Sequence, residues 1–480
     1  MLEFIKGVKN EAPFYYFEQI SKIPRASGNE KAVAKYIYDL ALGLGLDVYM
    51  DKSYNVFVVK KATSGRENDE PIMLQAHTDM VAEKNVNTMH DFEADPIELI
   101  QEGNVLRANG TTLGADDGFG VAIMLAVLAD NSLSHPMLEC LFTSSEEIGL
   151  VGASKFDYNR VKSRRMINLD SAEESTVIIG CCGGIRTELT LPVTKSEYNG
   201  DGVKITIGGL CGGHSGEDIN KGRLNSNILM GKAISHIMNT CEVVISYISG
   251  GDKDNAIPRE CETIIAPCDK TNSKLCLKVT QELNELLKKE IKANEDNGLF
   301  VKIEPVFVDY SFLLDDTKRI LRVLSAPNAI LKFRAEPPIL PETSRNLARV
   351  RTNDDDTISI GFSSRSYLES GLGDSIDELN KLSFCVGGAC YHHEKYPGWI
   401  SDKDSKLVLD WQNAFERICN KRPEATLIHA GLECGLISAE LDGLVAISVG
   451  CNVHDLHTPQ EAMELDSLDR IYEAVIEVLK

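Results

Sequence analysis

Histidine, aspartate and glutamate residues recur where apolar, strand-like runs of the sequence end. Five segments share this pattern, and their residues are His77 and Asp79, Asp116 and Asp117, Glu146 and Glu147, Asp170, and His454 and His457. In open α/β sheets, ligand sites lie beyond the carboxyl ends of the strands. We therefore expect these side chains, which come from distant parts of the chain, to converge at one site.

Carboxylates that converge repel one another, and buried carboxylates and imidazoles lose hydration. A bound cation offsets both costs and so stabilises such a cluster. A ligand set of imidazole and carboxylate without cysteine indicates Zn²⁺, or Mn²⁺ or Co²⁺ in its place. The carboxylates are too numerous for one tetrahedral ion. The pattern therefore predicts two ions, about 3.5–4 Å apart, that share one carboxylate as a bridge.

The pair Glu146–Glu147 lies in the stretch LFTSSEEIGL, directly after an apolar run that is typical of a buried strand. Taken alone, the pair is typical of a solvated helix start. At a metal centre, one glutamate can bind an ion while its neighbour stays free to act as a base. We expect the second arrangement because the other acidic and imidazole segments accompany it.

Three choices stay open from the spacing alone. Either Asp116 or Asp117 can supply the bridging carboxylate, since both precede an apolar helix. Either His454 or His457 can be a ligand, because both precede the terminal helix. Asp170 can be a ligand or can cap a turn.

Strand-like and helix-like runs alternate around these residues, which predicts a mixed α/β layer with parallel crossovers. The expected strands are 48–61, 71–77, 137–143, 165–170 and 443–450, and the expected helices are 29–43, 118–131, 405–418 and 467–480.

The pattern changes after about residue 184. Short alternating strands are expected at 202–210, 261–269, 300–308 and 356–364, with helices at 223–240 and 275–293. We interpret this region as an α+β insertion with an exposed sheet. The sequence thus predicts one domain formed by 1–184 and 399–480, interrupted by a second domain at 185–398.

Charge and composition exclude several classes of partner. The 480 residues carry a formal net charge of −22, which argues against nucleic acid and against an anionic membrane surface. No signal peptide and no membrane-spanning run are expected. The 13 cysteines are scattered, odd in number and without a C-x-x-C pair, which indicates free thiols in a reducing cytoplasm.

Six motifs, in their order along the chain, resemble those of the co-catalytic zinc peptidases of the aminoacylase and carboxypeptidase type. They are AHTDM, TTLGADDG, SSEEIGLVGA, NLDS, GGHSG and HDLHTPQE. IPRASGNE near the start and IHAGLECGLI near the end extend the resemblance over essentially the full length. The nearest subgroup is the bacterial aminoacyl-histidine dipeptidases. The resemblance implies a phosphorylase/hydrolase-like mixed-sheet catalytic domain interrupted by an α+β lid domain.

The resemblance implies two Zn²⁺ ions per chain and a ligand for each position of the site. Asp116 would bridge the ions. His77 and Asp170 would complete one ion site, and Glu147 and His457 the other. Family members also have a cis peptide bond after the bridging aspartate, which here is the bond that follows Asp116.

Roles beyond the metal ligands are also implied by the resemblance. Glu146 would be the general base, and Asp79 would orient a ligating histidine. His214, in CGGHSGE of the lid, would supply a donor to the tetrahedral oxyanion on domain closure. Arg365 would bind the free carboxylate of the substrate, with Asn255 as a further polar contact.

The predicted function is hydrolysis of short peptides, chiefly dipeptides, and the resemblance implies a preference for Xaa-His substrates such as carnosine. The alternatives are a broader di- and tripeptidase, an N-acyl-amino-acid amidohydrolase, and a catalytically silent metal-binding scaffold. A homodimer through the lid domain is the implied assembly.

Overall fold

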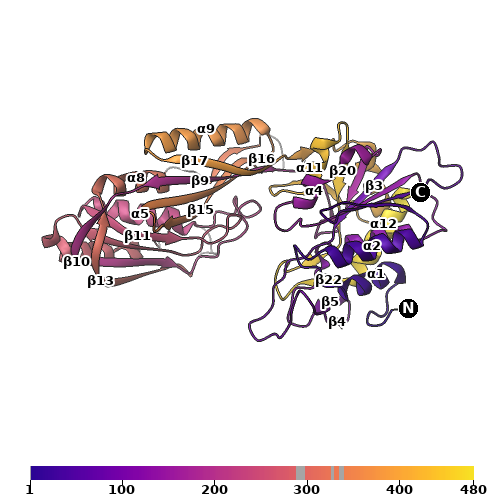
Figure 1. Cartoon of the computed structure of the whole chain (residues 1–480), viewed down its shortest axis with the longest axis horizontal. Helices are drawn as coiled ribbons and strands as arrows, with labels where there is room; N and C mark the ends of the chain where they lie inside the picture. The colour runs from indigo at the N-terminus through magenta and orange to yellow at the C-terminus, as the bar shows by residue number, and fades with distance from the viewer. Residues whose placement is uncertain (1, 288–297, 326–328, 335–339) are drawn as a thin grey trace. The chain divides into compact units, whose positions relative to one another are not determined.

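The computed structural model describes residues 2–287, 298–325, 329–334 and 340–480. The chain divides into two compact units (Figure 1). The first consists of Met1–Cys181, Gly398–Ile428 and Leu432–Lys480, and the second of Cys182–Pro397 and His429–Gly431. The roles of catalytic domain and lid domain stay predictions for these two units.

A mixed sheet forms the centre of the first unit. In spatial order its strands are β1 (Asp47–Met50), β2 (Val56–Lys60), β6 (Leu138–Thr143), β3 (Ile72–His77), β7 (Arg165–Asn168), β20 (Val445–Ser448), β8 (Thr176–Cys181) and β18 (Trp399–Ile400), and β19 (Glu424–Ile428) pairs with β8. β3 runs parallel to β6 and to β7, and β20 runs parallel to β7. These pairs confirm the predicted mixed α/β sheet.

Two of the strands that carry the candidate site, β3 and β6, are buried along their whole length. Every residue of β3 and of β6 is buried, as expected for strands covered on both faces. Because β3, β6 and β7 are parallel, their carboxyl ends lie at the same edge of the sheet. The turns that follow them therefore present their side chains together.

Helices and a small sheet complete the first unit. The helices are α1 (Glu11–Ser21), α2 (Lys31–Gly43), α3 (Ala115–Ala129), α4 (Val151–Lys155), η1 (Tyr158–Arg160), α10 (Lys406–Cys419), α11 (Glu433–Glu440) and α12 (Leu465–Leu479). The small sheet has the order β21 (Val453–His454), β22 (Ala462–Glu464), β5 (Val105–Ala108) and β4 (Leu99–Glu102). Helix α3 is buried nearly all round and packs against α1 and β3.

The second unit is built on a separate antiparallel sheet. Its strands, in spatial order, are β13 (Phe300–Phe312), β10 (Lys195–Gly208), β12 (Cys261–Pro267), β11 (Val243–Gly250), β15 (Pro341–Thr352), β16 (Thr357–Ser366), β9 (Gly183–Pro192) and β17 (Ala389–Tyr396), and β14 (Ile330–Phe333) pairs with β15. Its helices are α5 (Ser226–Met238), η2 (Lys270–Asn272), α6 (Ser273–Gln281), α7 (Leu283–Leu287), α8 (Leu314–Ser325) and α9 (Glu369–Cys385). This α+β sheet agrees with the predicted fold class.

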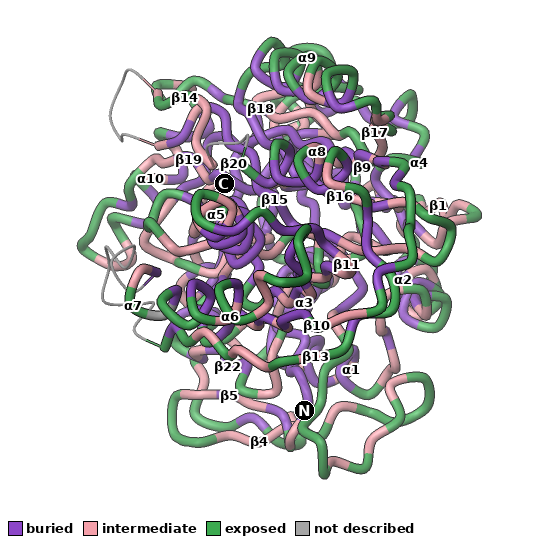
Figure 2. Tube along the Cα trace, turned by 90° about the vertical axis from the view of Figure 1, so that its left-hand side faces the viewer, coloured by how far each residue is buried: buried purple, intermediate pink, exposed green. Residues whose placement is uncertain are grey.

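Two helices of the second unit differ in how far they are buried. Figure 2 shows α9 with many exposed positions, whereas α5 is largely buried against β10, β11, β12 and β15.

Two predicted elements differ from the structure. The run 48–61 is the hairpin of β1 and β2, and the helix expected at 275–293 is the pair α6 and α7, with 288–293 outside the described residues.

The thirteen cysteines all lie in the described part of the chain and none forms a disulfide. Only Cys211, Cys268 and Cys385 are exposed, and all three belong to the second unit. Across the residues that the structure describes, no helix combines the length and the apolar character needed to cross a membrane.

Candidate metal centre

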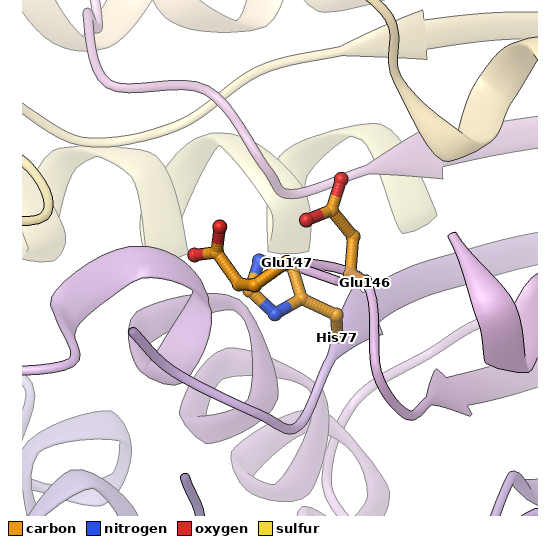
Figure 3. A group of neighbouring side chains, drawn as sticks. All are labelled: His77, Glu146 and Glu147. Atoms are coloured by element: carbon orange, nitrogen blue, oxygen red, sulfur yellow. The ribbon is translucent and has the colours of Figure 1, made fainter. Parts of the chain in front are cut away.

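The candidate site lies at the carboxyl ends of β3, β6 and β7 in the first unit. His77 is the last residue of β3, the two glutamates follow β6, and Asp170 comes two residues after β7. Figure 3 shows that Glu146 and Glu147, although adjacent, extend their carboxylates in different directions near His77. The sheet topology therefore brings together residues that are far apart in the sequence.

The carboxylate of Asp116 lies between two imidazole rings. Its Oδ1 is 3.0 Å from Nε2 of His77, and its Oδ2 is 3.2 Å from Nε2 of His457. Each oxygen thus faces a different histidine, which is the arrangement that a bridging carboxylate requires.

Two groups of donor atoms share this carboxylate. One contains His77, Asp116 and Asp170, and the other contains Asp116, Glu147 and His457, with the donor atoms of each group within 4.8 Å of one another. Oε1 of Glu147 lies 3.1 Å from Nε2 of His457, and Oδ1 of Asp170 lies 3.8 Å from Nε2 of His77. Imidazole and carboxylate donors in two adjoining groups fit a pair of divalent cations.

Burial disfavours the ionised form of the acidic side chains when no cation is bound. Burial, together with neighbouring carboxylates, raises the pKa of Glu146, Glu147 and Asp170. Burial also opposes ionisation of Asp116, but hydrogen bonds from His457 and His77 outweigh it and hold the pKa of Asp116 below its usual range. Divalent cations among these groups would favour the ionised carboxylates throughout.

Asp117 occupies a different position from Asp116. Its buried carboxylate accepts hydrogen bonds of 3.2 Å from the backbone amides of His77 and Gly120. The structure therefore brings Asp116 to the imidazoles and Asp117 to the backbone, a distinction that spacing alone left open. The expected cis peptide bond between Asp116 and Asp117 is present.

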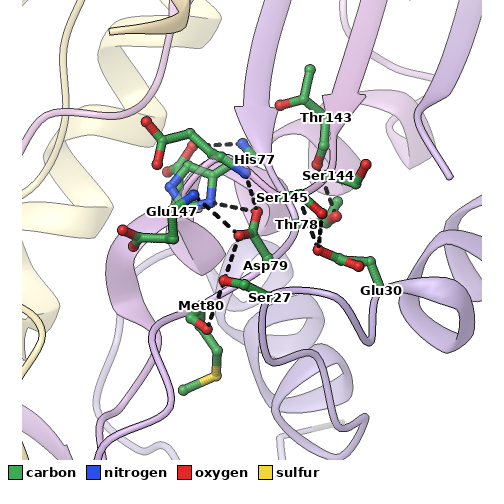
Figure 4. A network of polar contacts seen from close by, with 12 residues as sticks. Ser27, Glu30, His77, Thr78, Asp79, Met80, Thr143, Ser144, Ser145 and Glu147 are labelled. Carbon is green, nitrogen blue, oxygen red and sulfur yellow. Dashed lines mark hydrogen bonds and ion pairs between the residues drawn. The ribbon is translucent and has the colours of Figure 1, made fainter. Parts of the chain in front are cut away.

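Asp79 connects the histidine of β3 to the turn after β6 (Figure 4). Its fully buried carboxylate lies 3.4 Å from Nδ1 of His77 and accepts the amides of Glu146 and Glu147 at 3.0 and 3.2 Å. Ser27 donates to it at 2.7 Å. Asp79 therefore orients the glutamate pair as well as the imidazole, and only the contact with the imidazole was expected.

His454 lies outside the candidate site. Its Nε2 is 2.9 Å from Oε1 of Glu464 and its side chain is 56% exposed. The structure thus brings His457, and not His454, to Asp116.

Three buried charged residues next to the site were not predicted. Glu461 accepts hydrogen bonds from four consecutive amides, those of residues 113–116. Arg25 donates to the carbonyls of Thr78 and Asp79, and Glu433 accepts from Gln75 and Thr143. The segments IPRASGNE, HTPQE and IHAGLECGLI contain these residues, but their partners are distant in sequence.

His214 and Arg365 lie together within the second unit. The amide of Glu217 donates to Nδ1 of His214 at 3.2 Å, and Nη2 of Arg365 lies 3.4 Å from Nε2 of the same ring. A neutral imidazole accepts at only one nitrogen, so the two hydrogen bonds belong to different tautomers. An imidazole beside a guanidinium suits the recognition of an anionic group such as a carboxylate or an oxyanion.

The guanidinium of Arg365 is held by a neighbouring ring. Its Nη1 donates to the hydroxyl of Tyr396 at 2.7 Å, and Gly184 and Gly431 leave room for that ring, because a Cβ at either would lie within 2.6 Å of it. Asn255 is exposed, and its carbonyl accepts the amide of Ser215, next to His214. The structure thus brings three of the predicted second-unit residues into one neighbourhood.

Known proteins match this chain over most of its length. The family model described as peptidase family M20/M25/M40 matches residues 73–480. The chain is 35% identical over 469 residues to the cytosol non-specific dipeptidase of Escherichia coli (strain K12), covering 97% of this chain and 96% of the relative.

Solved peptidase structures also match this chain over nearly its whole length. Aminoacylhistidine dipeptidase from Vibrio alginolyticus matches with a TM-score of 0.84 and 34% identity, over 98% of this chain and 96% of that one. A tripeptidase from Staphylococcus aureus matches with a TM-score of 0.57 and 16% identity over 98% of both chains, which supports the fold alone. The chain therefore belongs to peptidase family M20/M25/M40 and is a metallopeptidase of that family.

Proposed function

We propose that this protein is a dipeptidase that hydrolyses short peptides with two divalent metal ions and a glutamate base. The observation that carries the proposal is the carboxylate of Asp116, which has one oxygen on His77 and the other on His457. Asp170 and Glu147 complete the two donor groups around it. We assign these five residues as the ligands, with Zn²⁺ as the expected metal and Mn²⁺ or Co²⁺ as substitutes.

Bound divalent ions supply Lewis-acid polarisation of the scissile carbonyl and make water acidic enough to attack at neutral pH. Glu146 is the proposed general base: it accepts the proton of the attacking water and returns it to the leaving amine. The hydrogen bonds from the amides of Glu146 and Glu147 to Asp79 support this assignment, because they fix the turn that carries the base. Asp79 also sets the orientation of His77.

We assign substrate recognition to the second unit. His214 is the proposed donor to the oxyanion, and Arg365 the proposed partner of the substrate carboxylate, with Asn255 as a further polar contact. The 3.4 Å separation of Nε2 of His214 from Nη2 of Arg365 supports these roles, because the guanidinium and a ring protonated at Nε2 can both donate to one anion.

Substrate preference has two candidates. The name of the Vibrio alginolyticus relative supports Xaa-His dipeptides such as carnosine, and that of the Escherichia coli relative supports a broader range of dipeptides. A panel of Xaa-His and other dipeptides, measured by kcat/KM, separates them. A preference of at least tenfold for histidine at the second position supports the first candidate, and equal values support the second.

The proposed activity is tested by removing and restoring the metal. Treatment with a chelator should abolish dipeptide hydrolysis, and Zn²⁺ or Mn²⁺ should restore it. The Asp116→Asn variant replaces the bridging carboxylate with a neutral amide, so the same metal concentrations should not restore its activity. Hydrolysis that persists in the chelated protein would contradict the proposal, and a protein that binds metal without hydrolysing any dipeptide would be the silent scaffold.

We also propose a cytoplasmic homodimer that pairs through the second unit. Strand β13 is an edge strand of that unit's sheet and exposes Phe300, Phe307 and Tyr310, an apolar set that pairing would cover. The word cytosol in the name of the Escherichia coli relative supports the location. Light scattering on the purified protein, with Phe307→Glu as the variant expected to be monomeric, tests the assembly.

A further inference from the structure

We propose that Glu461 is a positioning residue that ties the segment of His457 to the loop of Asp116 and thereby sets the affinity of the metal centre. This inference rests on the proposed metal site. Glu461 is not itself assigned as a ligand. Its carboxylate acts on the backbone that carries the bridging residue.

Both carboxylate oxygens of Glu461 accept hydrogen bonds from backbone amides. Its Oε2 accepts the amides of Leu113 and Gly114 at 2.8 and 3.0 Å, and its Oε1 accepts those of Ala115 and Asp116 at 2.8 and 3.3 Å. Four consecutive amides that point at one carboxylate are a concave anion site of backbone origin. The last of the four belongs to the residue whose side chain lies between the two imidazoles.

The four amides lie before the regular part of α3. Glu461 is 2% exposed, and Asp116 and Asp117, at the start of α3, have non-helical backbone angles. The carboxylate is therefore held by amides of a non-helical backbone segment, which carry positive partial charge next to it.

The same loop is held from its other side by Arg25. The buried guanidinium of Arg25 donates to the carbonyl of Gly114, while Glu461 accepts the amide of that same residue. Opposed contacts on one peptide segment restrict its rotation. The direction of the Asp116 side chain therefore depends on both.

Glu461 also fixes the position of His457. Only three residues lie between them, and the amide of Glu461 donates to the carbonyl of Thr458 at 3.0 Å, which closes a turn there. Any movement of this turn relative to Leu113–Asp116 changes the separation of His457 from Asp116. Glu461 therefore couples two proposed ligands, Asp116 and His457, that are 341 residues apart in the sequence.

The Glu461→Gln variant tests this role with little change of shape. A glutamine places an NH₂ group against two backbone N–H donors, which cannot hydrogen-bond to it. Partners that orient metal ligands contribute 10–100-fold to metal affinity, so we expect Zn²⁺ and Mn²⁺ to bind about 10–100-fold more weakly. Glu464→Gln is the matched control, since that carboxylate is in the same segment and contacts Asn452 and His454 instead.

The measurement is metal affinity by competition with a chromophoric chelator, made on the full chain together with the melting temperature of the metal-free protein. At least tenfold weaker binding in Glu461→Gln, with wild-type binding in Glu464→Gln, supports the inference. A lower melting temperature with wild-type metal affinity overturns it, because Glu461 would then stabilise the fold only. If Glu461→Gln does not fold, Glu461→Asp is measured with the same criteria.

Failure of the metal site itself would give a different result. If the wild-type chain binds no divalent ion, the proposed function fails, and this inference fails with it. If the wild-type chain binds metal and hydrolyses dipeptides while Glu461→Gln does both equally well, only the inference fails.

Discussion

Replacement of Glu433 by glutamine should remove a pH dependence from the stability of the first unit. The side chain is fully buried and its Oε2 accepts hydrogen bonds from Gln75 and Thr143. Burial raises its pKa from the usual value of 4.5 to about 7. A glutamine has the same shape as the protonated acid and keeps an oxygen for both donors, but it cannot ionise.

The sign and size follow from this pKa. The folded-state value exceeds the unfolded-state value, so the folded protein binds more protons between pH 4.5 and about 7. The contribution of Glu433 to stability is therefore complete below pH 4.5 and is lost as the pH rises to about 7. An interval of about 2.5 pH units corresponds to about 3 kcal/mol. Relative to wild type, the Glu433→Gln variant should gain stability over this interval and stay level above it.

Tryptophan fluorescence during urea unfolding suits the measurement, because Trp399 and Trp411, the two tryptophans of the chain, both lie in the first unit. Metal-free wild-type and variant proteins would be compared from pH 5 to pH 8. Groups that titrate in both proteins cancel in the difference. A difference that is flat across this range would refute the reasoning. Glu440→Gln, an exposed position on the same helix, tests whether burial is the cause.

Three further outcomes are expected. Glu146→Gln should lower kcat by about 10²–10⁴-fold and leave metal affinity nearly unchanged, as the loss of a general base requires, and wild-type turnover in this variant would exclude it as the base. Zn²⁺ should raise the urea midpoint of the metal-free protein, measured by tryptophan fluorescence, because the cation offsets the repulsion among buried carboxylates. Asp170→Asn should reduce this rise, and an equal rise in wild type and variant would contradict the assignment of Asp170 as a ligand. Tyr396→Phe should raise KM about fivefold or more for dipeptides with a free carboxylate but not for dipeptide amides, because it releases Arg365 and costs about one hydrogen bond. An equal change in KM for both kinds of substrate would show that Tyr396 does not act through the carboxylate partner.

Much of the first unit was predictable because its central strands are buried on both faces. The runs at β3, β6 and β20 are short and mostly apolar, and those at β3 and β6 lead directly into polar residues, which is typical of buried parallel strands. The hairpin of β1 and β2 was not separated in the prediction. Its turn passes through Tyr54 at φ 67°, a conformation that tyrosine does not signal.

The strands of the small sheet were not predicted either. β4, β5, β21 and β22 contain two to four residues each, which is too short for an alternating pattern to stand out from the surrounding loop. They are defined by pairing between segments that are distant in the sequence, and the segment of His457 lies between two of them. Local sequence does not record such pairing.

The residues of the two donor groups could be predicted because metal chemistry restricts candidate ligands to few residue types. The residues that orient these groups are less restricted, since any buried acceptor can orient a backbone amide. Glu461 and Asp79 act on amides, and an amide has no sequence signature. Their partners became visible only when the fold had brought the segments together.

The distribution of cysteines gives the two units different chemical reactivities. The three exposed thiols, at Cys211, Cys268 and Cys385, are all in the second unit, while the cysteines of the first are buried except for the half-buried Cys419. A thiol-specific reagent added to the native protein should therefore label the second unit first. Fluorophores attached there would report on one half of the molecule, while tryptophan emission reports on the other.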